Sequence, residues 1–400
     1  MLQRHEYISQ IDKWLGKDLV IVLTGQRRVG KSCLLKLLCQ QKAENPKNNI
    51  IYIDKEKHQF DSIATHSQLN EYIEQHRAAG CVNYILIDEV QEIAEFERSL
   101  RNYCSEPDIE VIVTGSNAKM LSGELATIIG GRYKEIYIHP LSYSEFLSFH
   151  GMSDSDDALA SYLQYGGMPG LQKIGLSEDF ALEYLQDIYH TVLLKDVILR
   201  NKIRNATFLK NLALFIADNI GKPISAYSIA RYMKSQGESI NPTTILEYIR
   251  YLCEAFIMRS IKRYDLHGKR LFDSNHKYYF EDHGLRNAIV GGSREGDIEK
   301  IIENVVLQHL LRMGYQVTVG QLRAGEIDFV CTTKVGGRFY LQASYVIVDS
   351  ATREREFGNL QAIGDNYPKY LVSMTPLVTK TNNNGIIHLH LRQFLLSKSL

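Results

Sequence analysis

The sequence lacks net charge, is poor in proline and contains no apolar run long enough to cross a bilayer. Its 46 Lys and Arg residues balance 46 Asp and Glu residues, and only 8 of its 400 residues are proline. Zero net charge argues against attraction of the whole molecule to nucleic acid or an anionic membrane, so either contact would need a local patch. The first apolar run, from Leu19, is too short for a membrane span and too far along the chain for a cleavable signal. We therefore expect a cytoplasmic globular protein that makes no membrane contact.

The six cysteines are scattered and form no Cys-x-x-Cys pair. Several lie inside apolar runs, which predicts buried thiols in a reducing compartment rather than disulfides or zinc ligands. A chain of 400 residues is also too long for one hydrophobic core, and its length suits about two to four domains. The composition therefore indicates a globular protein of several domains.

A phosphate-binding pattern is present in "LVIVLTGQRRVGKSCLLKLL", which begins at Leu19. An apolar strand, the loop Gly25-x-x-x-x-Gly30-Lys31-Ser32 and a leucine-rich helix follow one another in the order that such loops require. The two glycines let the backbone curl so that its amide N–H groups face phosphate oxygens at the start of the helix. Lys31 is then expected to contact the β- and γ-phosphates, and the Ser32 hydroxyl to bind Mg2+.

An acidic pair follows the buried strand of "NYILIDEVQEI". In parallel sheets, ligands bind where strands end, and here the strand ends in Asp88 and Glu89. Asp88 would hold Mg2+ through water, and Glu89 would orient the attacking water. By itself the pair also fits the solvated start of a helix, so the interpretation depends on the glycine loop upstream.

Two further candidates come from "IEVIVTGSNAKML" and "IIGGRYKEIYIHPLSYSEF". The first strand ends in Thr114, Ser116 and Asn117, which suit a γ-phosphate sensor or, equally, a helix N-cap. Arg132 follows a glycine pair and is a candidate arginine finger, a cation that neutralises transition-state charge. An ordinary surface arginine is the alternative.

These motifs resemble prokaryotic AAA+ ATPases that join the ATPase to a winged helix and a C-terminal restriction-endonuclease-like domain of unknown function. The resemblance is carried by "TGQRRVGKS", "ILIDEVQ", "VTGSNAKML", "GGRYKEIYIHPLSYSEF", "YGGMPG", "KYYFEDHGLRNAIVG" and "GEIDFV…YLQASY". It implies catalytic roles for Lys31, Glu89, Asn117 and Arg132, with Ser116 as an alternative sensor, and Mg2+ binding by Ser32 and Asp88. It implies that "YGGMPG" is a hinge. ATP would be bound by Gly25, Gln26, Arg27, Arg28, Val29, Gly30, Lys31, Ser32 and Cys33.

The implied fold is α/β, with a P-loop AAA+ parallel-sheet core at 1–150 and a helical lid or connector at 151–205. A winged helix-turn-helix would occupy 206–275, and a restriction-endonuclease-like α/β domain 276–400. The helical face from Phe208 to Ile216, the Asn241-Pro242 helix start and a hairpin turning near His267 and Gly268 fit a winged helix.

From Lys222 to Arg270 the chain carries nine Lys or Arg against four Asp or Glu, an excess of +5, which suits phosphate contacts with DNA. The third helix instead exposes Glu247 and Glu254, so a protein-interaction element or a reader of nucleotide state is the alternative. The basic residues are Lys222, Arg231, Lys234, Arg250, Arg259, Lys262, Arg263, Lys269 and Arg270.

The C-terminal segment is predicted to run α-β-β-β-α-β, with "GEIDFVCTTKVGGRFYLQASY" as its central hairpin. A nuclease of this fold needs carboxylates for Mg2+ and a lysine to stabilise charge on phosphate. The candidate site residues are Glu303, Glu326, Asp328 and Gln342. Gln342 is a weak ligand and Ser344 supplies no cation, which predicts a catalytically degenerate site; Lys369 is the nearest substitute lysine by topology. His388 and His390 share a strand face but have no third ligand nearby, so they are interpreted as edge-strand residues.

The sequence therefore predicts an Mg2+-dependent ATPase that acts as a nucleotide-driven switch on DNA or a protein partner. A binding module with a slow, timer-like ATPase is one alternative, and an ATP-gated Mg2+-dependent nuclease is another. An arginine finger that acts in trans would also require a homo-oligomer.

Overall fold

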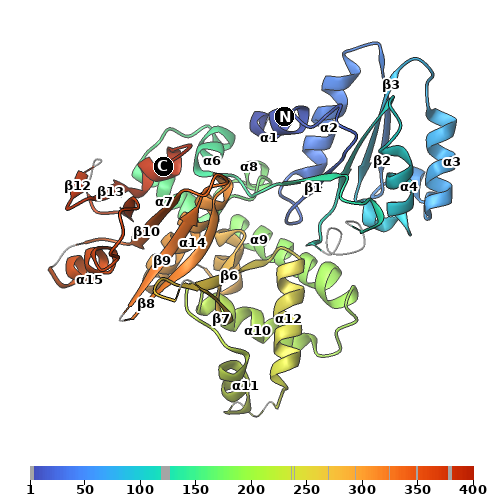
Figure 1. Cartoon of the computed structure of the whole chain (residues 1–400). Helices are drawn as coiled ribbons and strands as arrows, with labels where there is room; N and C mark the ends of the chain where they lie inside the picture. Colours follow the sequence, from blue (N-terminus) through green and yellow to red (C-terminus); the bar gives the residue numbers. More distant parts are fainter. Residues whose placement is uncertain are drawn as a thin grey trace. The chain divides into compact units, whose positions relative to one another are not determined.

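The computed structural model describes residues 4–118, 127–235, 237, 239–268, 270–292, 294–323, 325–347, 350–376 and 381–400. The chain divides into two compact units (Figure 1). The first comprises Met1–His139 together with Glu254–Phe256, and the second comprises Pro140–Cys253 and Ile257–Leu400.

The first unit is built on a five-stranded sheet of order β2-β3-β4-β1-β5, and every paired strand in it is parallel. Helices α1 and α2 lie on one side of this sheet and α3 and α4 on the other (Figure 1). This arrangement confirms the predicted α/β fold with a parallel P-loop core. The elements are α1 (His5–Asp12), β1 (Val20–Thr24), α2 (Lys31–Ala43), β2 (Asn48–Asp54), η1 (His58–Phe60), α3 (His66–His76), β3 (Val82–Asp88), η2 (Val90–Glu92), α4 (Phe96–Tyr103), β4 (Ile109–Thr114) and β5 (Tyr133–Tyr137).

The sequence of the central strands explains their place in the sheet. All five residues of β1 are buried, as are six of the seven in β3, because helices cover both faces and only continuous apolar runs suit such strands. Since β1, β3 and β4 are neighbours and parallel, their carboxyl ends meet at one edge. The phosphate loop, Asp88 and Thr114 are therefore brought together by topology.

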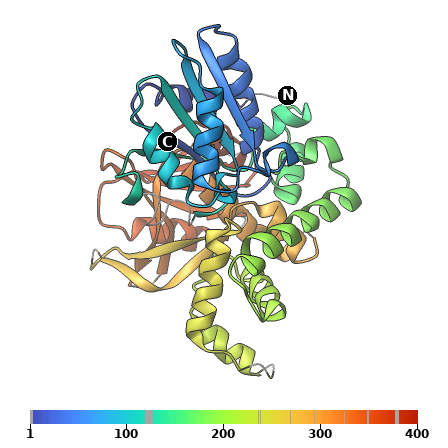
Figure 2. The same ribbon diagram turned by 90° about the vertical axis from the view of Figure 1, so that its right-hand side faces the viewer.

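The second unit begins with helices and ends with a sheet. Its first part holds α6 (Tyr143–His150), α7 (Asp156–Tyr165), α8 (Leu171–Ile174), α9 (Glu178–Val192), a π-helix (Leu193–Leu199), α10 (Ala206–Asp218), α11 (Ala226–Ser235) and α12 (Pro242–Glu254). Helix α11 lies at the far end of α12, away from the sheet of this unit (Figures 1 and 2). Among the helices of the described segments, none is long and apolar enough to cross a membrane.

The sheet of the second unit has eight strands in the order β12-β13-β11-β10-β9-β8-β6-β7 and mixes parallel with antiparallel pairs. Its elements are β6 (Met258–Asp265), β7 (Arg270–Phe280), α13 (His283–Ile289), η5 (Glu295–Asp297), α14 (Ile298–Arg312), β8 (Gln316–Leu322), β9 (Gly325–Thr332), β10 (Arg338–Ser344), α15 (Ser350–Gln361), β11 (Lys369–Ser373), β12 (Thr381–Asn383), β13 (Ile386–His390) and α16 (Leu391–Leu396). Hairpin β6–β7 joins this sheet because β6 pairs in parallel with β8, Arg263 opposite Val319. The boundary predicted at residue 275 thus falls inside β7.

The "YGGMPG" segment is a packed junction inside the second unit. A Cβ on Gly166 would lie 2.5 Å from an Asp282 carboxylate oxygen, and one on Gly167 would lie 2.4 Å from the Leu141 carbonyl oxygen. The Gly167 amide donates to Asp282 at 2.7 Å. The two units part at His139 and Pro140, so the predicted hinge does not coincide with the boundary between them.

Candidate functional site

The phosphate loop adopts the strained backbone that its glycines permit. Gly25 has φ of +135°, and a Cβ there would lie 2.3 Å from the Ile138 carbonyl oxygen, so no larger residue fits. Gly30 also has positive φ, +99°, and leads directly into α2. Lys31 is buried, and its ammonium donates to the carbonyls of Gly25 at 2.8 Å and Gln26 at 3.0 Å. The lysine therefore lies over the loop whose amides would face a phosphate.

The remaining loop residues frame this lysine. Gln26 is fully buried, and neither oxygen nor nitrogen of its amide has a hydrogen-bond partner within the described residues. Arg27 contacts Glu56 at 3.5 Å. Arg28 takes a left-handed conformation with φ of +72°, Val29 is buried, and Cys33 is exposed on α2. Buried unpaired polar atoms at a binding loop suit a ligand that completes their hydrogen bonds.

Asp88 is buried at the carboxyl end of β3 beside the loop. Its Oδ1 accepts a hydrogen bond of 2.5 Å from the Thr114 hydroxyl of β4. Burial raises the pKa of Asp88, and hydrogen bonds from the Thr114 and Ser32 hydroxyls partly oppose that rise. The two predicted Mg2+ ligands, Ser32 and Asp88, are thus in contact.

Glu89 is turned back over the sheet edge by a left-handed backbone with φ of +55°. Its amide donates to Thr114 Oγ1 at 2.9 Å, and its carboxylate accepts from Ser116 Oγ at 3.2 Å and from Gln91 Nε2. Asn117 is buried immediately after Ser116. The structure therefore brings the acidic pair and the predicted sensor residues to one place.

Asp54 is a site residue that sequence reasoning missed. It ends β2, faces Asp88 as its Cα partner in β3, and is almost fully buried. Lys36 lies 3.6 Å from its carboxylate and the Tyr52 hydroxyl 3.3 Å away. The sequence signal that could have identified Asp54 is the apolar run "IIYID", which ends in aspartate just as the apolar run that ends at Asp88 does.

Arg132 lies at the amino end of β1, whereas the phosphate loop lies at the carboxyl end. Its carbonyl accepts a hydrogen bond from the amide of Val20, the first residue of β1. The phosphate loop follows Thr24, the last residue of the same strand. Its guanidinium donates to Ser105 Oγ. Five strand residues, a span of about 15 Å, separate this arginine from the loop. The structure therefore does not bring Arg132 to the phosphate loop of its own chain.

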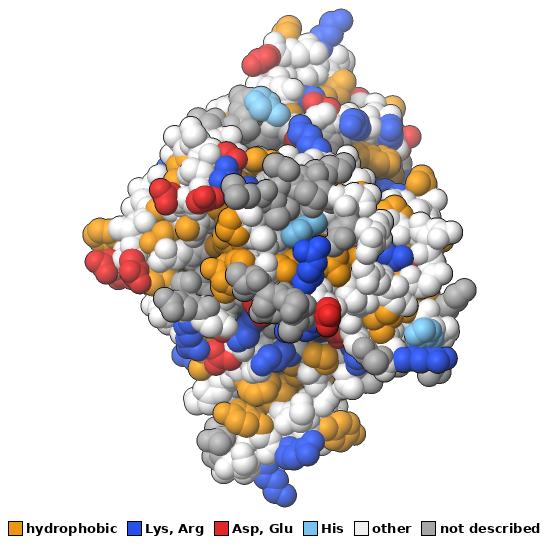
Figure 3. All heavy atoms as spheres, turned by 90° about the vertical axis from the view of Figure 1, so that its left-hand side faces the viewer, with side chains coloured by type: hydrophobic (Ala, Val, Ile, Leu, Met, Phe, Trp, Pro, Cys, Tyr) orange, Lys and Arg blue, Asp and Glu red, His pale blue; other side chains and the backbone are white. Residues whose placement is uncertain are grey.

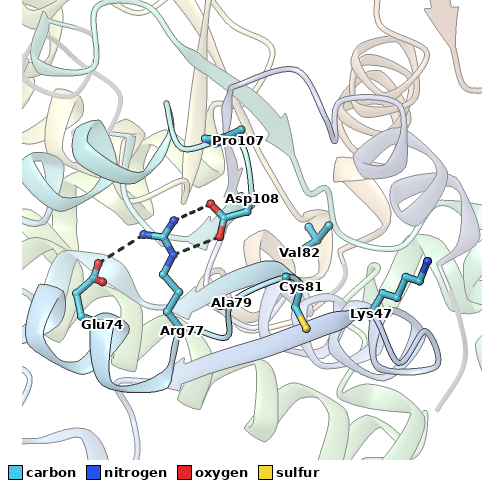
Figure 4. Close-up of a pocket in the computed structure, with 9 residues that line it drawn as sticks. Lys47, Glu74, Arg77, Ala79, Cys81, Val82, Pro107 and Asp108 are labelled. Atoms are coloured by element: carbon cyan, nitrogen blue, oxygen red, sulfur yellow. Dashed lines mark hydrogen bonds and ion pairs between the residues drawn. The ribbon is translucent and has the colours of Figure 1, made fainter.

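A surface hollow also lies at the amino ends of the strands, beside the starts of β3 and β4 (Figure 4). Arg77 dominates it and donates to Asp108 at 2.6 Å and to Glu106 at 3.3 Å. Glu74 lies 4.0 Å from the same guanidinium. Because three carboxylates neutralise this cation, the hollow does not suit a phosphate.

The residues at the loop fit a nucleotide with Mg2+. Mg2+ is usually bound through one or two carboxylates, hydroxyls and the phosphates of the substrate, and Asp88 and Ser32 are such donors in contact. Within the described ranges, no group of three or more His, Cys, Asp or Glu side chains is arranged to hold a metal ion without such a substrate.

A second polar cluster lies in the sheet of the other unit and includes the four residues predicted for a degenerate nuclease site. Glu303 comes from α14, Glu326 and Asp328 from β9, and Gln342 from β10. At their centre is a lysine that sequence reasoning missed, Lys277 of β7. Its ammonium contacts Glu303 at 3.1 Å and also Glu326, and its side chain is 3% exposed.

The other predicted residues of this unit have separate roles. The Lys369 ammonium donates to the carbonyls of Ile363 and Asp365, so this candidate lysine is engaged elsewhere. His388 is hydrogen-bonded to Ser373 Oγ at 2.8 Å, and His390 caps α16. Strand β13, which carries both histidines, lies between β12 and β11, so the prediction that they are edge-strand residues is wrong.

Comparisons with known proteins identify an AAA domain in the first part of the chain. Residues 17–147 match the family model of an AAA domain, and residues 156–296 match a domain of unknown function, DUF8612. In fold, the chain is similar to the Walker-type ATPase paby2304 of Pyrococcus abyssi, with a TM-score of 0.50 and 14% identity over 72% of this chain and 96% of that one.

Two relatives are similar in sequence. An uncharacterised protein of Methanocaldococcus jannaschii, MJ1544, is 27% identical over 74% of this chain and 67% of its own length. An uncharacterised protein of Haemophilus influenzae is 32% identical over 93% of both chains. The chain therefore belongs to the same family as the Haemophilus influenzae protein, and it contains an AAA domain.

Proposed function

We propose that this protein is an Mg2+-dependent ATPase that uses ATP binding and hydrolysis to switch its interaction with a DNA or protein partner. The observation that carries the proposal is the convergence of Lys31, Ser32, Asp88 and Glu89 at one edge of the parallel sheet.

The chemistry follows from the positions of these side chains. Ser32 and Asp88 would hold Mg2+, which when bound would supply positive charge to offset the charge that develops on the phosphates. The loop amides orient the phosphates, and the Lys31 ammonium, already directed into the loop, adds positive charge. Ser116 donates to Glu89, which would orient the attacking water. The contact supports a role for Ser116, with its neighbour Asn117, as the sensor of the γ-phosphate.

The test separates binding from turnover. Lys31→Ala should abolish or nearly abolish ATP binding, because it removes the cation of the loop. Glu89→Gln should bind ATP with wild-type affinity and lower kcat by about a hundredfold or more. ATP affinity is measured by calorimetry and turnover by phosphate release.

The matched control is Glu92→Gln, an exposed glutamate in the next turn of the chain, which should behave as wild type. Turnover by Glu89→Gln at the wild-type rate would remove Glu89 from its role, and strong ATP binding by Lys31→Ala would refute the nucleotide site.

For the partner, we propose that α10–α12 and hairpin β6–β7 act as a winged-helix element. Of the basic side chains that the structure describes from Lys222 to Arg270, five are exposed: Lys222, Arg231, Lys234, Arg250 and Lys262. Arg259 is paired with Glu281, and Arg263 donates to Gln321, so these two are already engaged; Lys269 lies outside the described residues. On the face shown in Figure 3, Lys and Arg side chains are interspersed with acidic and hydrophobic ones. Salt-dependent binding to duplex DNA would identify a nucleic-acid partner, and its absence would favour a protein.

A further inference from the structure

Arg4, the residue before α1, is a buried cation that contacts the phosphate loop from outside. Its side chain is largely shielded from solvent, and its Nη1 donates to the Val29 carbonyl at 3.2 Å and to the His139 carbonyl at 2.9 Å. Val29 belongs to the phosphate loop, and His139 lies two residues beyond the end of β5. One guanidinium therefore joins two segments that are far apart in the sequence.

Tyr7 of α1 strengthens the hold on His139. The Arg4 guanidinium lies over the Tyr7 ring, 4.5 Å from its centroid. The Tyr7 hydroxyl accepts a hydrogen bond from the His139 amide at 3.1 Å. Because Tyr7 follows Arg4 by one helical turn, the two side chains lie on the same side of α1. Together they hold both the carbonyl and the amide of His139.

The contact between Arg4 and Val29 bears on phosphate binding. A hydrogen bond from a cation is stronger than one between neutral groups, and it polarises the peptide that accepts it. The Val29 carbonyl shares its peptide bond with the amide of Gly30, the residue that leads into α2. Arg4 is therefore expected to fix this peptide and to strengthen its N–H as a donor to a phosphate.

His139 is also the last residue of the first unit before the chain passes into the second. Beyond this crossing, the Pro140 carbonyl accepts from Arg312 of α14, whose guanidinium also contacts Glu145 at 2.7 Å. Each side of the crossing is thus fixed by an arginine, Arg4 before it and Arg312 after it. A movement of His139 is therefore expected to be passed on to Pro140 rather than absorbed by loose chain.

We propose that Arg4 is a positioning residue that links the phosphate loop to the crossing at His139 and Pro140. Phosphates bound at the loop attract the Gly30 amide, and with it the Val29 carbonyl, which Arg4 holds. Since the same guanidinium holds His139, nucleotide binding alters the backbone at the crossing. This inference rests on the proposed function, because it requires ATP at the loop, and it names the route by which ATP acts on the second unit.

The test is amide hydrogen exchange of residues 138–143 in the full chain, with and without saturating ATP and Mg2+. All samples carry Glu89→Gln, so that ATP is bound without rapid turnover. We expect ATP to slow exchange in this segment of the parent by about threefold or more. Arg4→Met should bind ATP about tenfold more weakly, as measured by calorimetry, and at saturating ATP should show no slowing.

A milder variant keeps the proposal falsifiable if Arg4→Met folds poorly. Tyr7→Phe retains the ring but removes the hydroxyl that accepts from His139. It should bind ATP within about twofold of the parent and lose about half of the slowing, a separation that a general loss of stability would not produce. The matched control Lys13→Met removes an exposed cation from the end of α1 and should behave as the parent.

Two results would overturn the link while leaving the nucleotide site intact. One is ATP binding by the parent with unchanged exchange in 138–143. The other is the same slowing by ATP in Arg4→Met and Tyr7→Phe as in the parent. A parent that binds no ATP would overturn the link and the proposed function together.

Discussion

Lys277 is the buried cation that balances the charges of two glutamates in the second unit. Its ammonium is buried between Glu303 and Glu326, and Tyr279 donates to the same Glu303 oxygen at 2.6 Å. The attraction of these carboxylates outweighs the cost of burial and raises the pKa of Lys277 above its usual value. The lysine is therefore charged, and its removal leaves two glutamates without a counter-ion.

Lys277→Met should destabilise the second unit by about 3 to 5 kcal/mol, the usual cost of leaving a buried charge uncompensated. Chemical denaturation of the full chain measures the loss. Lys334→Met, at an exposed position in the turn between β9 and β10, is the matched control and should change stability by less than about 0.5 kcal/mol. Equal stability of the two variants would show that Lys277 does not hold the cluster together.

At this scale, a sequence pattern can predict a candidate site whose residues are close together in the chain. Lys31 and Ser32 lie within one loop, and that loop contains its own pattern. Lys277 contacts Glu303 and Glu326 across 26 and 49 positions of the chain, and no spacing in the sequence encodes such a contact.

Helix α14 contains a buried histidine that makes the stability of its unit depend on pH. His309 packs against Phe394 of α16 with ring centroids 4.9 Å apart, and its Nε2 is hydrogen-bonded to the Ser397 carbonyl at 3.0 Å. Burial, with a smaller contribution from the charge of Arg312, lowers the pKa of His309 from 6.5 to about 4. The folded state therefore holds the neutral imidazole.

The stability that comes from neutral His309 should be fully present above pH 6.5 and lost as the pH falls from 6.5 to about 4. In that window the unfolded histidine takes up a proton and the folded one does not. His309→Gln should flatten this dependence by up to about 3 kcal/mol, as measured by denaturation at a series of pH values. The exposed His190→Gln is the control. Because His283 and His388 also have lowered pKa values, part of the slope should remain.

The order of helices and strands could be predicted because it depends on local apolar periodicity. The pairing of strands could not, because it depends on residues far apart in the chain. The helix at Ile298–Arg312 and the three strands after it lie where apolar periodicity placed them. The parallel pairing of β6 with β8 was not predicted, because the paired residues Arg263 and Val319 are 56 positions apart. Likewise, "YGGMPG" carries glycines that suit either flexibility or close packing, and only the distances to Asp282 and Leu141 distinguish the two.

For the whole molecule, the place of Arg132 predicts action between subunits. Since it lies about 15 Å from its own phosphate loop along β1, it would reach a nucleotide only in a neighbouring copy. Arg132→Ala should then retain ATP binding and lose turnover by about a thousandfold. An equimolar mixture of Arg132→Ala and Glu89→Gln should regain activity, because each variant supplies the group that the other lacks.

Phosphate release from the separate and mixed variants, at several protein concentrations, measures this recovery. Arg101→Ala, which removes an exposed arginine from α4, is the control and should turn over ATP at the wild-type rate. A mixture no more active than its components would refute the role of Arg132 in trans.

Hairpin β6–β7 has a consequence for inheritance. It contributes two strands to the eight-stranded sheet and provides the lysine that balances Glu303 and Glu326. Recombination between related genes at the hairpin would therefore separate a cation from its carboxylates and leave strand β8 without its neighbour. The segment from β6 to β13 is expected to pass between lineages as one block, with position 277 and positions 303 and 326 changing together.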